Sequence, residues 1–318
     1  MKVLIPDKVD KKAIETLQKS GFDVDYKVGT KQEEFAGISA DADAMIVRSS
    51  VKVDKQVIDA AKKLKIVVRA GVGYDNIDVK YAAEKGIIVE NTPFGNTNAA
   101  AEHTLTLLMM LAKHVIHSHN KLKQGAWDKK SFEGTEVKGK TLGIIGIGKI
   151  GQKVAKVANA LEMSVLGFDP YVDANTLKAM GIIKVEFSDL IKKSDYITVH
   201  VPLTDKTKNM ISTEQFAAMK DGVRILNVAR GGVVDEKALE ESLKSGKVAA
   251  AALDVYAQEP PICSSLLAND RVICTPHLGG STKEAQINVG LDAANQIIIA
   301  LKEGKIENCV NGVKSLRK

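Results

Sequence analysis

The sequence has few cysteines and no long apolar run. Its three cysteines, Cys263, Cys274 and Cys309, are an odd number without the spacing of metal ligands, which predicts a reducing compartment. The apolar stretches are too short and too interrupted to span a bilayer, and residues 2–6 are typical of a first strand and not of a signal peptide. We therefore expect a cytoplasmic protein with no membrane partner.

Aromatic residues are also scarce, at 4% of the chain, and the lysines behind its net charge of +6 are scattered among acidic residues. A nucleic-acid-binding protein more often has clustered basic residues with interleaved aromatics, so we expect no nucleic-acid partner. The charge would help to attract a small anionic substrate, although solubility alone also explains it. The length of 318 residues and a hydrophobic content of 45% suit two globular domains.

The first ninety residues alternate short apolar runs with amphipathic segments. Strands are expected at 3–5, 23–26, 44–47, 66–68 and 87–89, and helices at 11–19, 55–62 and 78–85. This alternation predicts an α/β domain with a small parallel sheet. The segment contains no glycine-rich fingerprint for binding phosphate.

A second α/β set follows a long helix expected at 99–123. Six strands are predicted at 141–145, 164–168, 196–199, 224–228, 249–253 and 271–274, with helices at 149–161, 213–220 and 235–245 among them. Six strands with alternating helices match a complete dinucleotide-binding domain. A final helix at 282–302 has no strand left to follow, and we expect it to return to the first domain.

The most specific motif lies at the end of the 141–145 strand. Gly146, Gly148 and Gly151 have G-x-G-x-x-G spacing and lead directly into a helical pattern. In such a motif the first glycine makes the turn, the second admits a pyrophosphate, and the third lets helix and strand pack closely. An ordinary strand–helix turn is the alternative, but the flanking strand and helix favour a dinucleotide site.

Asp169 ends the next strand and predicts which dinucleotide binds. A carboxylate there can accept hydrogen bonds from both ribose hydroxyls but would repel a 2′-phosphate. No arginine occurs in residues 170–173 to bind such a phosphate. The sequence therefore favours NAD over NADP.

Three residues that follow strands of the second set are candidates for catalysis. Arg230 precedes two glycines and could hold a carboxylate through paired hydrogen bonds. The imidazole of His277 could act as a general acid–base group, and Glu259 could orient its ring. Each residue alone could be structural, but together they suit the oxidation of a hydroxyacid.

The other histidines have simpler interpretations. His114 and His117 share a helix face and His119 is close by, but no cysteine or carboxylate accompanies them at ligand spacing, so we favour a solvated or subunit-contact face over a metal site. His103 and His200 are expected to be packed or hydrogen-bonded near the domain junction.

Over nearly its entire length the chain resembles the D-isomer-specific 2-hydroxyacid dehydrogenases. Besides the glycine fingerprint, the matching segments are 47–50, 69–78, 91–96, 100–104, 200–204, 227–232, 252–255, 259–261 and 276–280. The resemblance implies two Rossmann-like or flavodoxin-like α/β domains with doubly wound parallel sheets. The NAD-binding domain, 96–283, would be inserted into a discontinuous substrate-binding domain, 1–95 and 284–318.

The resemblance also implies roles for individual residues. His277 would accept the hydroxyl proton, Glu259 would support the ring, and Arg230 would bind the α-carboxylate. The cofactor would be bound by Val72, Gly146, Gly148, Lys149, Ile150, Gly151, Asp169, Val201, Pro202, Val228, Ala229, Arg230, Asp254, His277, Gly279 and Gly280. The substrate would be bound by Arg48, Ser49, Arg69, Gly71, Gly73, Asn96, Arg230 and His277. No metal is expected.

The implied activity is the NAD-dependent oxidation of 3-phospho-D-glycerate, the first step of L-serine biosynthesis. Another hydroxyacid dehydrogenase, such as a hydroxypyruvate or glyoxylate reductase, is the near alternative, and an NAD-sensing corepressor-like scaffold is the distant one. Arg48 and Arg69 are the candidates for binding the substrate phosphate. A homodimer is expected through the helix at 99–123. The chain ends soon after residue 312, so we expect no serine-binding regulatory domain of the kind that this subgroup often carries.

Overall fold

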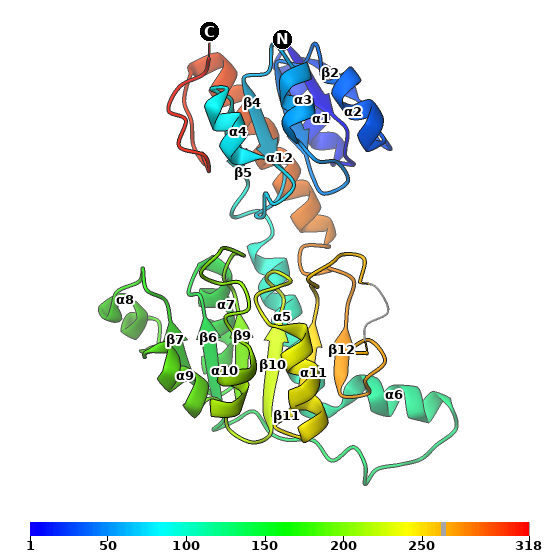
Figure 1. The fold of residues 1–318 in the computed structure, drawn as a ribbon, viewed down its shortest axis with the longest axis vertical. Coiled ribbons are helices and arrows are strands. Elements are labelled where there is room, and N and C mark those ends of the chain that lie inside the picture. Colours follow the sequence, from blue (N-terminus) through cyan, green and yellow to red (C-terminus); the bar gives the residue numbers. More distant parts are fainter. Residues whose placement is uncertain (262–264, 318) are drawn as a thin grey trace. The chain divides into compact units, whose positions relative to one another are not determined.

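The computed structural model describes residues 1–261 and 265–317, so Cys263 lies outside the described residues. The chain forms two compact units, Met1–Thr97 with Gly280–Lys318, and Asn98–Gly279. Each unit is an α/β fold built on one parallel sheet (Figure 1). The two-sheet α/β fold predicted from the sequence is confirmed. The boundaries differ from the expected 95 and 284 by two and four residues.

The first unit contains a five-stranded parallel sheet in the order β2-β1-β3-β4-β5. Its strands are β1 (Lys2–Ile5), β2 (Asp23–Tyr26), β3 (Ala44–Val47), β4 (Ile66–Arg69) and β5 (Ile88–Asn91). Its helices are α1 (Lys11–Lys19), α2 (Gln32–Ile38), α3 (Lys55–Ala60), α4 (Val79–Glu84) and α12 (Lys283–Glu303). The strands run close to their predicted bounds, whereas α2 was not predicted.

Strands β1, β3, β4 and β5 are buried on both faces, whereas the edge strand β2 is partly exposed. Alternate residues of each strand point to opposite sides of the sheet. Val3 and Ile5 pack into a cluster with α1 and α12, whereas Leu4 packs into another with α2, α3 and α4. Such continuous apolar strands are typical of a parallel sheet covered by helices on both sides.

Helix α12 belongs to the first unit, as predicted for the final helix. Thr282 caps its first turn by accepting a hydrogen bond from the Ala285 N–H. Val289 and Ala293 are buried in one cluster with Ala13 and Leu17 of α1. The last helix therefore completes the core that the first residues of the chain begin.

The second unit contains a seven-stranded parallel sheet in the order β12-β11-β10-β9-β6-β7-β8. The strands are β6 (Thr141–Ile145), β7 (Ser164–Phe168), β8 (Ile183–Lys184), β9 (Tyr196–Val199), β10 (Val223–Asn227), β11 (Val248–Leu253) and β12 (Val272–Cys274). The helices are α5 (Thr97–Lys113), α6 (Val115–Lys123), α7 (Lys149–Ala160), α8 (Ala174–Ala179), α9 (Phe187–Lys193), α10 (Thr213–Ala218) and α11 (Glu236–Ser245). The strand order reverses direction at β6 and β9, and ligands bind at such a switch point in open α/β sheets.

Two sequence predictions for this unit were wrong. The six-strand inventory omitted β8, whose two residues are exposed and carry no apolar pattern. The single long helix expected at 99–123 is two helices, because His114 adopts a left-handed backbone with φ of 53°. The Ala112 carbonyl, in the last turn of α5, accepts a hydrogen bond from the Thr135 N–H at 2.8 Å. This carbonyl is therefore satisfied by a later segment of the chain and not by a continuation of the helix. Among the described residues, no helix has the length and apolar character needed to cross a membrane.

Candidate active site

The three candidate catalytic residues lie at one edge of the second sheet. Arg230 follows β10, Glu259 follows β11 and His277 follows β12, and these three strands are parallel neighbours. Because the carboxyl ends of parallel strands meet at the same edge, the loops that carry the three residues emerge side by side.

His277 and Glu259 form a direct pair. Nδ1 of His277 lies 2.7 Å from Oε2 of Glu259, and both side chains are partly exposed. The other carboxylate oxygen, Oε1, accepts a hydrogen bond from the Tyr256 N–H at 3.2 Å, which fixes its orientation. Since a carboxylate only accepts, Nδ1 of the ring carries the hydrogen, and Nε2 is left as the basic nitrogen.

The Arg230 loop is held by the side chain of Asn227. Its oxygen accepts from the Ala229 N–H at 3.1 Å, and its amide donates to the Arg230 carbonyl at 2.9 Å. The guanidinium of Arg230 donates to the Ala229 carbonyl through Nη1 at 2.6 Å. A side-chain clamp therefore shapes the turn from which the candidate carboxylate-binding group projects.

Gly231 packs the Arg230 loop against the Glu259 loop. A Cβ atom at this position would lie 1.8 Å from the Tyr256 carbonyl oxygen and 2.6 Å from the Ala257 nitrogen. Only glycine permits so close a backbone approach. This contact links the loop of the arginine to the loop of the glutamate.

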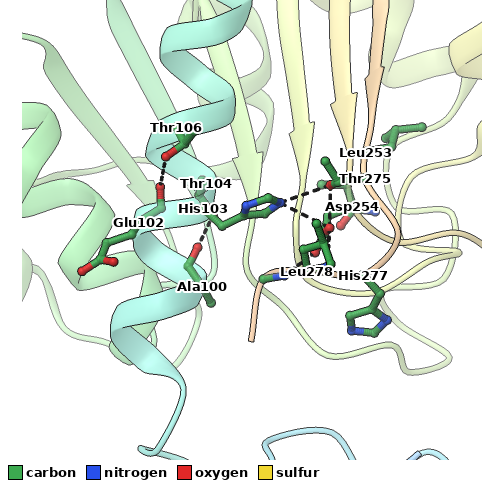
Figure 2. A network of polar contacts seen from close by, with 12 residues as sticks. Ala100, Glu102, His103, Thr104, Thr106, Leu253, Asp254, Thr275, His277 and Leu278 are labelled. Carbon is green, nitrogen blue, oxygen red and sulfur yellow. Dashed lines mark hydrogen bonds and ion pairs between the residues drawn. The ribbon is translucent and has the colours of Figure 1, made fainter. Parts of the chain in front are cut away.

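The loop that carries His277 is anchored on Asp254, whose side chain is fully buried (Figure 2). Its Oδ1 accepts from the Leu278 N–H at 2.7 Å and its Oδ2 from the Gly279 N–H at 2.8 Å. The Asp254 carbonyl accepts from the His277 N–H at 2.9 Å. Three consecutive N–H groups of the loop thus bond to one residue.

Two side chains complete the network around Asp254. The Thr275 hydroxyl donates to Oδ1 at 2.6 Å, and Nε2 of His103 lies 3.3 Å from the same oxygen. Burial alone would raise the pKa of Asp254, but the hydrogen bonds from His103, Thr275 and the two backbone N–H groups lower it below its ordinary value. The residue is therefore an ionised carboxylate within the protein.

This anchoring holds His277 in an uncommon backbone conformation. Its φ is 54°, in the left-handed region that costs an L-residue about 1–2 kcal/mol. In Figure 2 the imidazole of His277 projects away from the network around Asp254. The strained turn therefore directs the ring outward from the sheet edge.

The glycine-rich turn has the geometry of a phosphate-binding loop. Gly146 has φ of 92°, and a Cβ there would lie 2.7 Å from the His200 carbonyl oxygen. At Gly151 a Cβ would lie 2.3 Å from the Gly146 carbonyl oxygen. Gly148, by contrast, has no atom within 4 Å of its Cβ position, and no side chain caps the start of α7. The N-terminus of α7 therefore fits an anionic group.

Asp169 is tied to the same turn. Its Oδ2 accepts from the Ile147 N–H at 2.8 Å, and its Oδ1 accepts from the Tyr171 N–H at 2.9 Å. The carboxylate thus lies beside the fingerprint, at the end of the strand next to β6. Val201 and Pro202 follow β9 on the other side of β6, next to His200, whose N–H donates to the Ile145 carbonyl at 2.7 Å.

In the first unit, Arg48 follows β3 and Arg69 ends β4, so both lie at the carboxyl edge of that sheet. The N–H of Arg48 donates to Asp7 at 2.6 Å, and its Nη1 donates to the Lys8 carbonyl at 3.3 Å. Burial lowers the pKa of the Arg48 guanidinium, and the charge of Asp7 partly offsets this. Ser49, next in the chain, is exposed.

Arg69 folds back over the loop that follows it. Its Nη1 donates to the Ala70 carbonyl at 2.7 Å and lies 1.9 Å from the Cβ position of Gly71, whose φ is 147°. Val72 and Gly73 continue this half-buried loop, and the Val72 carbonyl accepts from the Asn91 amide at 2.6 Å. Near the other boundary of this unit, the Asn96 amide nitrogen lies 3.0 Å from the Cβ position of Gly280.

Sequence reasoning did not assign three residues that shape the site. Gly231 was noted only as one of the two glycines after Arg230, Thr275 was given no role, and His103 was expected to be a packed or hydrogen-bonded position. The close approach at Gly231 and the bonds to Asp254 join segments far apart in the chain, which no local pattern reveals. Among the described residues, no group of three or more metal-ligating side chains lies close enough to hold a metal.

The chain belongs to the D-isomer-specific 2-hydroxyacid dehydrogenases. The family profile described as "D-isomer specific 2-hydroxyacid dehydrogenase, NAD binding domain" matches residues 105–279, which lie within the second unit. The second unit is therefore an NAD-binding domain, and the chain is an oxidoreductase of this family, as predicted from the glycine fingerprint and the strand-end residues.

Similar proteins extend the match to nearly the whole chain. D-3-phosphoglycerate dehydrogenase of Archaeoglobus fulgidus is 47% identical over 98% of this chain and 59% of the relative. A solved glyoxylate reductase from Paecilomyes thermophila is 32% identical, with a TM-score of 0.90 over 98% of each chain. D-Lactate dehydrogenase from Aquifex aeolicus, solved with NAD and lactic acid, is 28% identical, with a TM-score of 0.85 over 98% of this chain and 99% of that one. The chain spans about three fifths of the length of the phosphoglycerate dehydrogenases that it matches.

Proposed function

We propose that this protein oxidises 3-phospho-D-glycerate to 3-phosphohydroxypyruvate, with NAD as the hydride acceptor. The main support is the contact between Nδ1 of His277 and Oε2 of Glu259, which are 2.7 Å apart at the sheet edge where Arg230 also lies. The pair supplies a base, and the arginine supplies a cation for the substrate carboxylate. The curated relatives named D-3-phosphoglycerate dehydrogenase support the choice of substrate. The reaction would be the first step of L-serine biosynthesis.

NAD fits the residues of the second unit. Gly146, Gly148, Lys149, Ile150 and Gly151 would hold the pyrophosphate at the start of α7, because the Cβ position of Gly148 is open. Asp169 would accept the ribose hydroxyls and disfavour NADP. When bound, NAD accepts the hydride that leaves the substrate carbon.

We propose that other residues named from the family resemblance also contact the cofactor. They are Val72, Val201, Pro202, Val228, Ala229, Gly279 and Gly280. Asp254 has no exposed surface and would act on this set through its hydrogen bonds with the Leu278 and Gly279 N–H groups. Val201 and Pro202 follow β9, which lies beside β6 at the switch point of the sheet, and this position supports their assignment.

In the proposed reaction the substrate hydroxyl proton moves to Nε2 of His277 as the carbon loses its hydride and the carbonyl forms. Glu259 keeps the hydrogen on Nδ1 and stabilises the protonated ring by its negative charge. Arg230 binds the α-carboxylate and fixes the orientation of the neighbouring hydroxyl. Partial exposure of His277 allows the proton to pass to solvent.

We propose that the first unit supplies further substrate contacts through Arg48, Ser49, Arg69, Gly71, Gly73 and Asn96. Arg48 and Arg69 are the cations proposed for the 3-phosphate, and their shared sheet edge supports this role. Replacing either by alanine should reduce kcat/KM for 3-phospho-D-glycerate by about tenfold more than for D-glycerate. Equal losses on both substrates would remove the phosphate assignment.

Glyoxylate or hydroxypyruvate reduction is the alternative, and the similarity to a glyoxylate reductase favours it. Steady-state kinetics over a panel of D-hydroxyacids and their ketoacids separates the two. The proposal requires the highest kcat/KM with 3-phospho-D-glycerate or 3-phosphohydroxypyruvate. A preference for glyoxylate supports the alternative, and NAD binding without turnover of any hydroxyacid supports a sensing scaffold.

We further propose a cytoplasmic homodimer that uses the segment from α5 to residue 132. Leu122 and Trp127 of this segment are 54% and 76% exposed, and exposed apolar side chains that lie together are typical of an interaction surface. They line a hollow with Ala126 and Phe132. A single sedimenting species of dimer mass is expected, and a monomer at micromolar concentration would contradict this assembly.

A further inference from the structure

His103 lies on α5 and contacts the network that anchors the His277 loop (Figure 2). Its Nε2 is 3.1 Å from the Thr275 hydroxyl oxygen and 3.3 Å from Oδ1 of Asp254. The side chain is 19% exposed. The hydroxyls of Thr104 and Thr106, also on α5, donate instead to carbonyls of the helix itself.

The contacts determine which ring nitrogen carries the hydrogen. The Thr275 hydroxyl has one hydrogen, and it is donated to Asp254 at 2.6 Å. The ionised Asp254 carboxylate has no hydrogen to donate. Both oxygens that face Nε2 of His103 therefore act as acceptors toward it, so Nε2 must be the donor.

The backbone of α5 also lies close to the loop that carries His277. The Cβ position of Gly279 is 4.0 Å from the Cα atom of Ala100 and 3.2 Å from Oδ2 of Asp254. A side chain at residue 279 would therefore crowd the carboxylate that its own N–H binds. Both His103 and Gly279 bring α5 and the loop together around the same buried charge.

We propose that His103 is a positioning residue for His277. Its Nε2–H holds Asp254 and Thr275 in place, and Asp254 in turn holds the backbone N–H groups of His277, Leu278 and Gly279. The strained turn at His277 then keeps its imidazole directed toward Glu259. That His103 affects catalysis rests on the proposed function. That His103 holds the loop through these hydrogen bonds does not.

The first test concerns the unmodified protein and needs no substrate. Nitrogen NMR of the ¹⁵N-labelled imidazoles should show His103 with hydrogen on Nε2, split by a directly bonded proton. A His103 ring that is protonated on Nδ1 alone would overturn the proposal. This result is independent of whether the protein oxidises phosphoglycerate.

The second test compares three variants on the same helix. H103L removes the donor, H103Q places an amide N–H where Nε2 lies, and E102Q alters an exposed neighbour whose side chain points away from His103 (Figure 2). We expect H103L to speed amide exchange at Leu278 and Gly279 and to lower kcat by about tenfold or more, with a smaller change in KM. H103Q should recover most of the loss, and E102Q should match the wild type.

Two results would overturn the role of His103. H103Q as impaired as H103L would show that the donated hydrogen bond does not matter. Unchanged amide exchange at residues 277–279 in H103L would show that His103 does not hold the loop. If the wild type turns over no hydroxyacid, the proposed function fails, while the NMR and exchange measurements still decide the positioning.

Discussion

Nδ1 of His277 lies 2.7 Å from Oε2 of Glu259, although the two residues are eighteen positions apart in the chain and lie on loops that follow different strands. The pairing keeps the hydrogen on Nδ1 and leaves Nε2 as the base. The sheet produces this pairing because β11 and β12 are adjacent and parallel, so their loops leave from the same edge.

The charge of Glu259 is the subject of the first prediction. In E259Q the amide oxygen can still accept from Nδ1, but no negative charge balances the protonated ring, so kcat should fall by about ten- to a hundredfold. Steady-state kinetics at saturating NAD measures this. Glu236 provides a matched control, because its carboxylate accepts from the nearby Ala257 N–H and the amide of E236Q can still accept this bond, so E236Q should keep most of the activity. Wild-type kcat in E259Q would contradict the role of the pair.

The second prediction separates two glycines of one motif. G151A should destabilise the protein by about 1–3 kcal/mol, because its Cβ would meet the Gly146 carbonyl oxygen at 2.3 Å. G148A should leave the unfolding free energy unchanged, because its Cβ meets no atom, yet should weaken NAD binding by about tenfold or more. Urea unfolding and calorimetric titration with NAD measure the two effects. If G148A and G151A changed the free energy of unfolding and the NAD affinity to the same extent, the open space at Gly148 would not be the phosphate position.

The third prediction concerns cofactor choice. Replacing Asp169 by serine should reduce the preference for NAD over NADP by about tenfold or more, because the charge that repels a 2′-phosphate is removed. The ratio of kcat/KM for the two cofactors measures this. The variant should also lose about 1 kcal/mol of stability, since Asp169 accepts from the Ile147 N–H. An unchanged cofactor ratio would show that another residue discriminates.

The fourth prediction concerns pH and His200, next to the glycine-rich turn. Burial lowers the pKa of His200 from 6.5 to about 4. In the unfolded chain His200 is protonated below about pH 6.5, whereas in the folded protein it stays neutral until about pH 4. The free energy of unfolding should therefore fall as the pH drops from about 6.5 toward 4. The loss should be at most about 3 kcal/mol, since one unit of pKa corresponds to roughly 1.4 kcal/mol.

Urea unfolding at neutral pH and near pH 5 measures this dependence. In H200N the titrating group is absent, so the stability lost between the two pH values should be smaller than in the wild type. Equal losses in both proteins would assign the pH dependence to other groups.

Much of the fold could be predicted because its strands are short, apolar and separated by amphipathic helices. The strands at 23–26, 44–47, 141–145 and 164–168 have the predicted bounds. The break at His114 could not be predicted, because a distant N–H, that of Thr135, binds the Ala112 carbonyl near the break. Strand β8 was missed because neither of its residues is buried.

The candidate site was less predictable than the fold. Arg230, Glu259 and His277 were found because each follows an apolar strand, and parallel sheets bring strand ends together. The hydrogen-bond network around Asp254 was not predicted, because it joins α5 to the ends of β11 and β12. Contacts between segments so far apart in the chain leave no local sequence pattern. Likewise, the requirement for glycine at 231 arises only from the Tyr256 carbonyl.

If His277 accepts the proton of a hydroxyacid during its oxidation by NAD, replacing His277 should slow the chemical step. The rate of this step can be measured by rapid mixing, as the formation of reduced nicotinamide from 3-phospho-D-glycerate in a single turnover of the wild type and of H277N. At saturating NAD, we expect the rate to be about a hundred- to ten-thousandfold lower in H277N than in the wild type. A rate within about threefold of the wild type would contradict it.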